Sequence, residues 1–201
     1  MGAPGQRQEF RKNVEATGEI LAHAPADSHV TIIGITDQSF AEPFLLLDAR
    51  IPQDPGYFEE RLTAARRALL QAWLTRTKAL QPSFRHTDIV GALLLASQIF
   101  QARPKGRRVL IIFSDMRENA GNLYLEGRNP ENARVSLNRY AQGRDIPDLH
   151  GIEVHVLGAD NAGKDMRYWQ ILRDFWTVYF KRTGAVLKTY SVLRDPPDLG
   201  P

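Results

Sequence analysis

The stretch Arg108-Val-Leu-Ile-Ile-Phe-Ser-Asp115 has the strongest strand pattern in the chain, because a continuous apolar run ends in a hydroxyl and a carboxylate. Such a run is typical of a strand buried on both faces of a parallel sheet. The nearly continuous β-branched run His29–Thr36 has the same character. Since binding sites in open parallel sheets lie at the carboxyl ends of the strands, Ser114 and Asp115 become candidate site residues.

Helices alternate with strands along the rest of the chain. Periodicity predicts helices at 7–24, 57–79, 88–102 and 165–181, and strands at 29–36, 43–48, 108–114, 151–157 and 186–192. The polar segment 117–149 is predicted to be a long loop around one short helix at 131–140. The gap between strands 29–36 and 43–48 is too short for a parallel crossover, so these two should form an antiparallel hairpin. We therefore expect a doubly wound, Rossmann-like α/β fold with a mostly parallel sheet, one antiparallel edge hairpin and helices on both faces.

Two helices have apolar faces that indicate a core. Phe58, Leu62, Ala65, Leu69 and Trp73 share one face of the predicted helix 57–79. The helix 165–181 has an aromatic stripe of Trp169, Leu172, Trp176 and Phe180, which we interpret as core and not as a cofactor site. We expect a single domain over residues 1–201, structured from about 7 to 193, with a Pro-rich tail at 194–201.

Composition excludes several classes of protein. The chain has 201 residues, 43% hydrophobic and 24% charged, and no cysteine, which rules out disulfides, thiolate zinc sites and a cysteine nucleophile. No apolar run approaches the ~18 residues of a membrane span. The net charge of +3 is mild, and the basic clusters at 103–108 and 181–182 are expected to be solvated ends of elements, so we do not expect nucleic acid binding. Met1–Gln6 has no signal pattern, so the chain as given is expected in the cytoplasm, or exported if a longer N-terminus exists.

Three polar groups stand at the predicted strand ends: Ser114-Asp115, Thr87-Asp88 and Asp37-Gln-Ser39. Hydroxyls and carboxylates without His or Cys suit Mg²⁺ or Mn²⁺ better than zinc. Each group also has a structural explanation. Thr87 could be a helix N-cap, Asp115 could cap a turn, and the Asp37 group could be the hairpin loop.

The sequence gives little support for an enzyme. It contains no Gly-x-Gly-x-x-Gly, P-loop or Gly-x-Ser-x-Gly pattern, and its five histidines have no zinc-ligand spacing. We therefore expect no catalytic residues. The alternative is a small metal-dependent hydrolase or phosphotransferase that uses Asp37, Asp88 and Asp115, although no nucleophile is paired with a base.

Thr87-Asp-Ile-Val-Gly-Ala-Leu93 at a helix start, followed by Val109-Leu-Ile-Ile-Phe-Ser-Asp115, resembles the von Willebrand factor type A domain family, in a bacterial-type form. The resemblance covers residues 7–193. It implies a protein-binding module with a metal-ion-dependent adhesion site, in which Thr87 and Asp115 match the second-loop and third-loop ligands of Mg²⁺ or Mn²⁺. It also places Asp88, Ser114 and Arg117 on the ligand-binding face.

The chain departs from this family at the first loop. The family carries Asp-x-Ser-x-Ser after a central strand, whereas no hydrophobic strand precedes the helix 7–24 here. Asp37-Gln-Ser39 matches only superficially, because Ala41 fills the third position and no helix follows. Either the central strand precedes the sequence given, or the protein is a variant with a partial metal site. In both cases we expect weak metal binding, and an exposed strand edge that could support a homo-oligomer.

Overall fold

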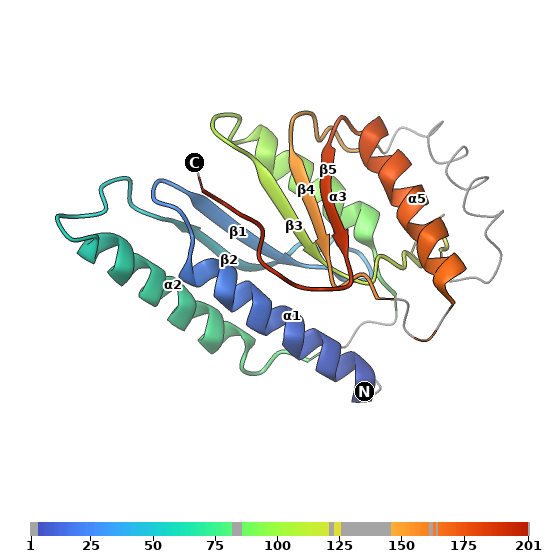
Figure 1. Cartoon of the computed structure of the whole chain (residues 1–201), viewed down its shortest axis with the longest axis horizontal. Helices are drawn as coiled ribbons and strands as arrows, with labels where there is room; N and C mark the ends of the chain where they lie inside the picture. The colour runs from blue at the N-terminus through green and yellow to red at the C-terminus, as the bar shows by residue number, and fades with distance from the viewer. Residues whose placement is uncertain are drawn as a thin grey trace. The chain divides into compact units, whose positions relative to one another are not determined.

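The computed structural model describes residues 4–81, 86–120, 123–125, 146–160, 163 and 165–200. Its elements, in chain order, are α1 (Pro4–Ala22), β1 (His29–Gly34), β2 (Phe44–Arg50), α2 (Glu60–Thr77), α3 (Ile89–Gln101), β3 (Val109–Phe113), β4 (Glu153–Leu157), α5 (Met166–Arg182) and β5 (Val186–Ser191) (Figure 1). The described residues form two compact units. The first contains residues 4–34, 44–81 and 195–200, and the second contains residues 35–43 and the described part of 86–194.

The first unit is built from α1, α2 and the β1–β2 hairpin. The two strands pair antiparallel, with His29 opposite Arg50, and the register shifts between Ile32 and Ile33. In the core of the unit, Trp73 of α2 is only 3% exposed and its Nε1–H donates to the Val14 carbonyl of α1 at 3.0 Å. The buried residues of this core are Leu21, Ala24, Leu46, Ile51, Leu62, Leu69 and Trp73. The amphipathic faces of the two helices therefore meet each other and the hairpin.

The second unit is built around the parallel strands β3, β4 and β5, which pair in that order. Helix α5 connects β4 to β5 and packs its aromatic stripe into the core, where Trp176 and Phe180 are fully buried. Asp165 begins α5 as its N-cap, accepting a hydrogen bond from the Tyr168 N–H at 2.8 Å. The helix ends before Gly184, whose φ of 77° is the left-handed conformation that glycine adopts most readily.

The structure confirms most elements that the sequence predicts, and it has the mixed α/β class. The described residues contain four helices, a three-stranded parallel sheet and an antiparallel hairpin, which forms a two-stranded sheet of its own and not the expected edge of the parallel sheet. Leu172, Trp176 and Phe180 of the predicted stripe are in the core, whereas Trp169 is half-buried and lies outside the core cluster. One placement is wrong: α2 begins at Glu60, and Phe58 lies outside the helix with 84% of its surface exposed. The reason is that the Glu60 carboxylate accepts the N–H groups of Tyr57 and Phe58, which holds both residues in a turn.

The short helix expected at 131–140 lies outside the described residues. The expectation of a single domain over residues 1–201 stays a prediction. No helix in the described part of the chain is both long enough and apolar enough to cross a bilayer.

Candidate functional site

The carboxyl ends of β3, β4 and β5 lie at one edge of the sheet of the second unit, because the three strands are parallel. The Ser114 N–H donates to the Leu157 carbonyl at 3.2 Å, so the ladder continues one residue beyond β3. Asp115 follows as the chain leaves the sheet. Ser114 and Asp115 therefore stand at the edge where binding sites of parallel sheets occur.

The residues after β3 form a tight turn. Ser114 Oγ accepts the Met116 N–H at 3.0 Å, and Asp115 Oδ1 accepts the Arg117 N–H at 3.2 Å. Met116 is fully buried with a φ of 61°, and its carbonyl accepts the Trp176 Nε1–H at 2.8 Å. The prediction that Asp115 could cap a turn is confirmed, and the turn is fixed to α5 through Trp176.

Asp88 joins the start of α3 to the loop that follows β1. Its Oδ1 accepts the Gly91 N–H and its Oδ2 accepts the Ser39 N–H, each at 2.8 Å. The Asp88 N–H donates to the Thr36 carbonyl at 2.8 Å. The N-cap of α3 is Asp88, so the alternative that Thr87 is the cap is wrong by one residue.

Thr87 is instead joined to the loop after β3 through Asn119. The Thr87 N–H donates to Asn119 Oδ1 at 2.6 Å, and the Asn119 N–H donates to the Thr87 carbonyl at 3.3 Å. Asp88 thus connects the start of α3 to the loop after β1, and Thr87 connects it to the loop that follows Ser114 and Asp115. These bonds link the three polar groups singled out in the sequence. The loop after β1 takes part through Thr36 and Ser39, whereas Asp37 is exposed.

Glu118 is a site residue that the sequence did not indicate. Its side chain is only 1% exposed, Oε2 accepts the Val90 N–H at 2.9 Å, and Oε1 accepts the Ala120 N–H at 3.0 Å. Burial raises the pKa of Glu118 from 4.5 to about 7, and the negative charge of Asp88 adds to the rise, whereas the backbone N–H groups of Val90, Ala120 and Ile89 oppose it. The first turn of α3 is thus held by a carboxylate from the loop after β3.

Arg117 and Asp115 are neighbours in this loop. Arg117 Nε lies 3.6 Å from Asp115 Oδ2, and the Arg117 guanidinium lies 5.7 Å from the centre of the Tyr168 ring. The Arg117 side chain is 11% exposed and that of Asp115 is 40% exposed. Tyr190 of β5 is near these two residues. Burial raises the pKa of its hydroxyl, and the charge of Asp115 raises it further. Tyr190, like Glu118 and Asn119, was not indicated by the sequence.

The expected metal ligands do not form a strong cation site in this arrangement. Both oxygens of Asp88 accept backbone N–H groups, and the Asp115 carboxylate already lies beside a guanidinium cation. Within the described residues, no group of three or more His, Cys, Asp or Glu side chains could hold a metal ion. The residues present therefore do not fit a tightly held Mg²⁺ or Mn²⁺.

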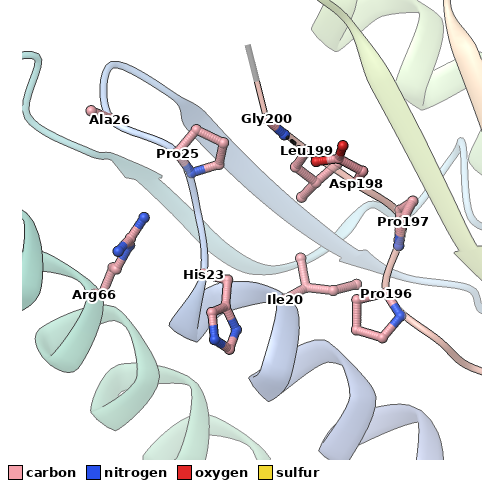
Figure 2. Close-up of a pocket in the computed structure, with 10 residues that line it drawn as sticks. All are labelled: Ile20, His23, Pro25, Ala26, Arg66, Pro196, Pro197, Asp198, Leu199 and Gly200. Carbon is pink, nitrogen blue, oxygen red and sulfur yellow. Dashed lines mark hydrogen bonds between the residues drawn. The ribbon is translucent and has the colours of Figure 1, made fainter.

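A separate pocket of about 480 Å³ lies in the first unit (Figure 2). It is lined by Ile20 of α1, by His23 directly after that helix, by Arg66 of α2, and by the segment 196–200 near the C-terminus. His23 Nδ1 is hydrogen-bonded to the Glu19 carbonyl at 2.8 Å, and Arg66 Nε donates to the Ala24 carbonyl at 2.9 Å. Both polar side chains thus support the end of α1, and none of the sequence-predicted site residues lines this pocket.

Comparisons with protein-family models, with curated proteins and with solved structures found no match to this chain.

Proposed function

We propose that this chain is a non-catalytic protein-interaction module of the von Willebrand factor type A kind, with a doubly wound fold and a partial metal-ion-dependent adhesion site. One observation supports this proposal most directly. The loop after β1, the start of α3 and the loop after β3 are tied together by the bonds Asp88–Ser39, Thr87–Asn119 and Glu118–Val90. A face assembled from three loops at the carboxyl end of a parallel sheet is suited to binding.

The partner-binding face would contain Thr87, Asp88, Ser114, Asp115 and Arg117. The half-buried cap at Asp88 and the buried cap at Glu118 hold the loops in one arrangement, which lowers the entropy that a partner must remove on binding. The Asp115 side chain is 40% exposed, so its carboxylate is accessible to a partner. We expect the partner to contact the surface around it.

Metal binding at this face would be weak. Thr87 and Asp115 remain the candidate ligands of Mg²⁺ or Mn²⁺, but the Arg117 guanidinium beside Asp115 opposes a second positive charge there. The alternative enzyme would need Asp88 as a free carboxylate, whereas both of its oxygens accept backbone N–H groups. We therefore favour a binding module over a metal-dependent hydrolase or phosphotransferase.

Self-association is a second property that we propose for the module. β3 is at one edge of the three-stranded sheet as the described residues define it, and all five of its residues are apolar. An apolar edge strand can pair with another chain. Light scattering that shows a strict monomer at high concentration would contradict this part of the proposal.

Site-specific photo-crosslinking in the native host tests the binding face. A photoreactive amino acid would replace Thr87 or Asp115, and a matched control would replace Lys105, which is exposed and precedes β3 at its opposite end. We expect both face positions to give the same partner adduct and the Lys105 position to give none. Equal capture at all three positions would contradict the proposal. So would Mg²⁺-dependent phosphatase or esterase turnover that is lost in Asp115→Ala.

A further inference from the structure

Arg117 has hydrogen-bond donors that the described residues do not satisfy. Its Nε and Nη2 are both buried and neither has a hydrogen-bond acceptor in the described part of the chain. The 3.6 Å from Nε to Asp115 Oδ2 is too long for a hydrogen bond, although it is an electrostatic contact. Buried donors in native proteins are nearly always paired, so an acceptor for Arg117 is expected.

The position of these two nitrogens on the guanidinium indicates which acceptor fits. Nε and Nη2 lie on the same edge of the planar group and direct two parallel N–H bonds outward. A carboxylate, with two oxygens in one plane, accepts both bonds at once. A single water molecule or carbonyl oxygen cannot match this pair in the same way.

Tyr190 supplies a third donor in the same region. Its hydroxyl is buried and has no hydrogen-bond partner within the described residues. Both Asp115 and Arg117 are near enough to influence its pKa, which burial raises, so the hydroxyl keeps its proton at neutral pH. The ring is positioned by an edge-on contact with Trp169, with the two ring centres 5.6 Å apart.

We infer that Arg117 and Tyr190 form a subsite for a carboxylate, which an acidic side chain of the protein partner would supply; this rests on the proposed function. Asp115 sets the charge that the subsite accepts. Its own negative charge already balances that of Arg117, so it opposes any anion and opposes a dianion such as phosphate more than a monoanion. The positive charge that binds the carboxylate belongs to the chain itself, so the interaction requires no divalent metal ion.

The subsite can be tested on the full chain without any protein partner. Sodium acetate would be titrated in the presence of a chelator, with sodium chloride at matched ionic strength as the reference and inorganic phosphate as a second probe. The Arg117 Nε–H resonance in ¹⁵N NMR spectra would report binding in chains that keep Arg117, and the backbone N–H resonances of the loop after β3 would report it in every variant. Arg117→Lys keeps the charge but loses the two-donor edge. Arg107→Lys is the matched control, since the same edge of the Arg107 guanidinium, Nε and Nη2, already donates to the Glu153 carboxylate.

Acetate is expected to shift the Arg117 signal saturably, with an affinity in the millimolar range. Arg117→Lys should weaken acetate binding about tenfold, because the second of two parallel hydrogen bonds is lost, and Tyr190→Phe about threefold, because one hydrogen bond from an uncharged donor is lost. Asp115→Asn should tighten it about fivefold, because the negative charge beside Arg117, which repels the acetate, is removed. A metal-bridged site predicts the opposite sign for Asp115→Asn.

Several results would overturn the inference. These are equal shifts with chloride, an unchanged affinity in Arg117→Lys, tighter binding of phosphate than of acetate, or a requirement for Mg²⁺. If Arg117→Lys fails to fold, the sign of the Asp115→Asn effect still decides. Because the titration uses the chain alone, a negative result would overturn the carboxylate subsite but would not decide the crosslinking test of the proposed function.

Discussion

The Glu118 carboxylate accepts a hydrogen bond from the Val90 N–H at 2.9 Å, so a side chain from the loop after β3 caps the first turn of α3. The positive end of the α3 dipole favours the negative charge of the Glu118 carboxylate, whereas its near-complete burial opposes that charge. The balance leaves the pKa of Glu118 at about 7, well above its ordinary 4.5. The connection between the loop and the helix is therefore sensitive to pH.

The first prediction concerns stability against pH. A group whose pKa is raised in the folded state stabilises the protein fully below its unfolded pKa, and this contribution is lost as pH rises through the folded value. The difference between 4.5 and about 7 corresponds to a loss of about 3 kcal/mol at most. Urea unfolding should therefore show a lower free energy of unfolding at pH 8 than at pH 5.

Two variants test the assignment of this pH dependence to Glu118. Glu118→Gln should remove the difference between pH 5 and pH 8, whatever its effect on stability itself. Glu60→Gln is the matched control, because Glu60 also accepts backbone N–H groups near a helix start, but its pKa is lowered. The control should keep the wild-type dependence. The same dependence in Glu118→Gln would contradict the assignment.

The second prediction concerns the contact between Asp88 and Gly91. An added Cβ at Gly91 would clash with Asp88 Oδ2, so Gly91→Ala must displace the carboxylate that caps α3 and holds Ser39. Gly91→Ala should thus destabilise the protein even though alanine favours helices. In an Asp88→Ala background the same substitution should stabilise it, by up to about 1 kcal/mol.

A double-mutant cycle measured by chemical denaturation checks this change of sign. Asp88→Ala alone should cost about 2 kcal/mol, and Asp165→Ala about 1 kcal/mol, since both remove an N-cap but only Asp88 also holds a second loop. Additive effects of Asp88→Ala and Gly91→Ala would refute the proposed contact.

The sequence predicts the elements better than it predicts the connections between them. Strand 108–114 and helix 88–102 differ from β3 and α3 by one residue at each end, because both are long patterns with clear ends. Glu118 was not indicated, since its polar neighbours suggest an exposed loop. Its burial depends on the first turn of α3, 28 residues earlier in the chain.

In the candidate site, too, the sequence predicts single elements better than the contacts between them. Ser114 and Asp115 were identified because they directly follow the strongest strand, and such positions in parallel sheets are accessible to ligands. The contact of Arg117 with Tyr168 joins the loop after β3 to α5, and Tyr190 comes from β5. No local pattern places such residues together, because the packing of distant elements creates the cluster.

The third prediction concerns divalent cations. Calorimetric titration with Mg²⁺ or Mn²⁺ should show no binding tighter than about millimolar, as expected for a site with few charged ligands. The physical reason is that the Asp115 carboxylate already lies 3.6 Å from the Arg117 Nε. Micromolar binding that Asp37→Ala abolishes would contradict this prediction and make Asp37–Ser39 the first metal-binding loop.

The fourth prediction concerns Trp176, which connects α5 to the turn after β3. Its ring is fully buried and its Nε1–H donates to the Met116 carbonyl at 2.8 Å. Trp176→Phe should cost about 3 kcal/mol through lost volume and an unpaired carbonyl. Because Met116 lies between Asp115 and Arg117, we also expect the Arg117 Nε–H resonance to move or broaden.

Trp73→Phe is the matched control for Trp176→Phe. The Trp73 ring is 3% exposed and its Nε1–H donates to the Val14 carbonyl at 3.0 Å, but this contact is in the first unit. Trp73→Phe should lose about as much stability as Trp176→Phe, but the Arg117 Nε–H signal should stay at its wild-type position. An unchanged Arg117 signal in Trp176→Phe would mean that the turn keeps its geometry without the indole, and that the Ser114 and Asp115 side-chain bonds suffice to hold it.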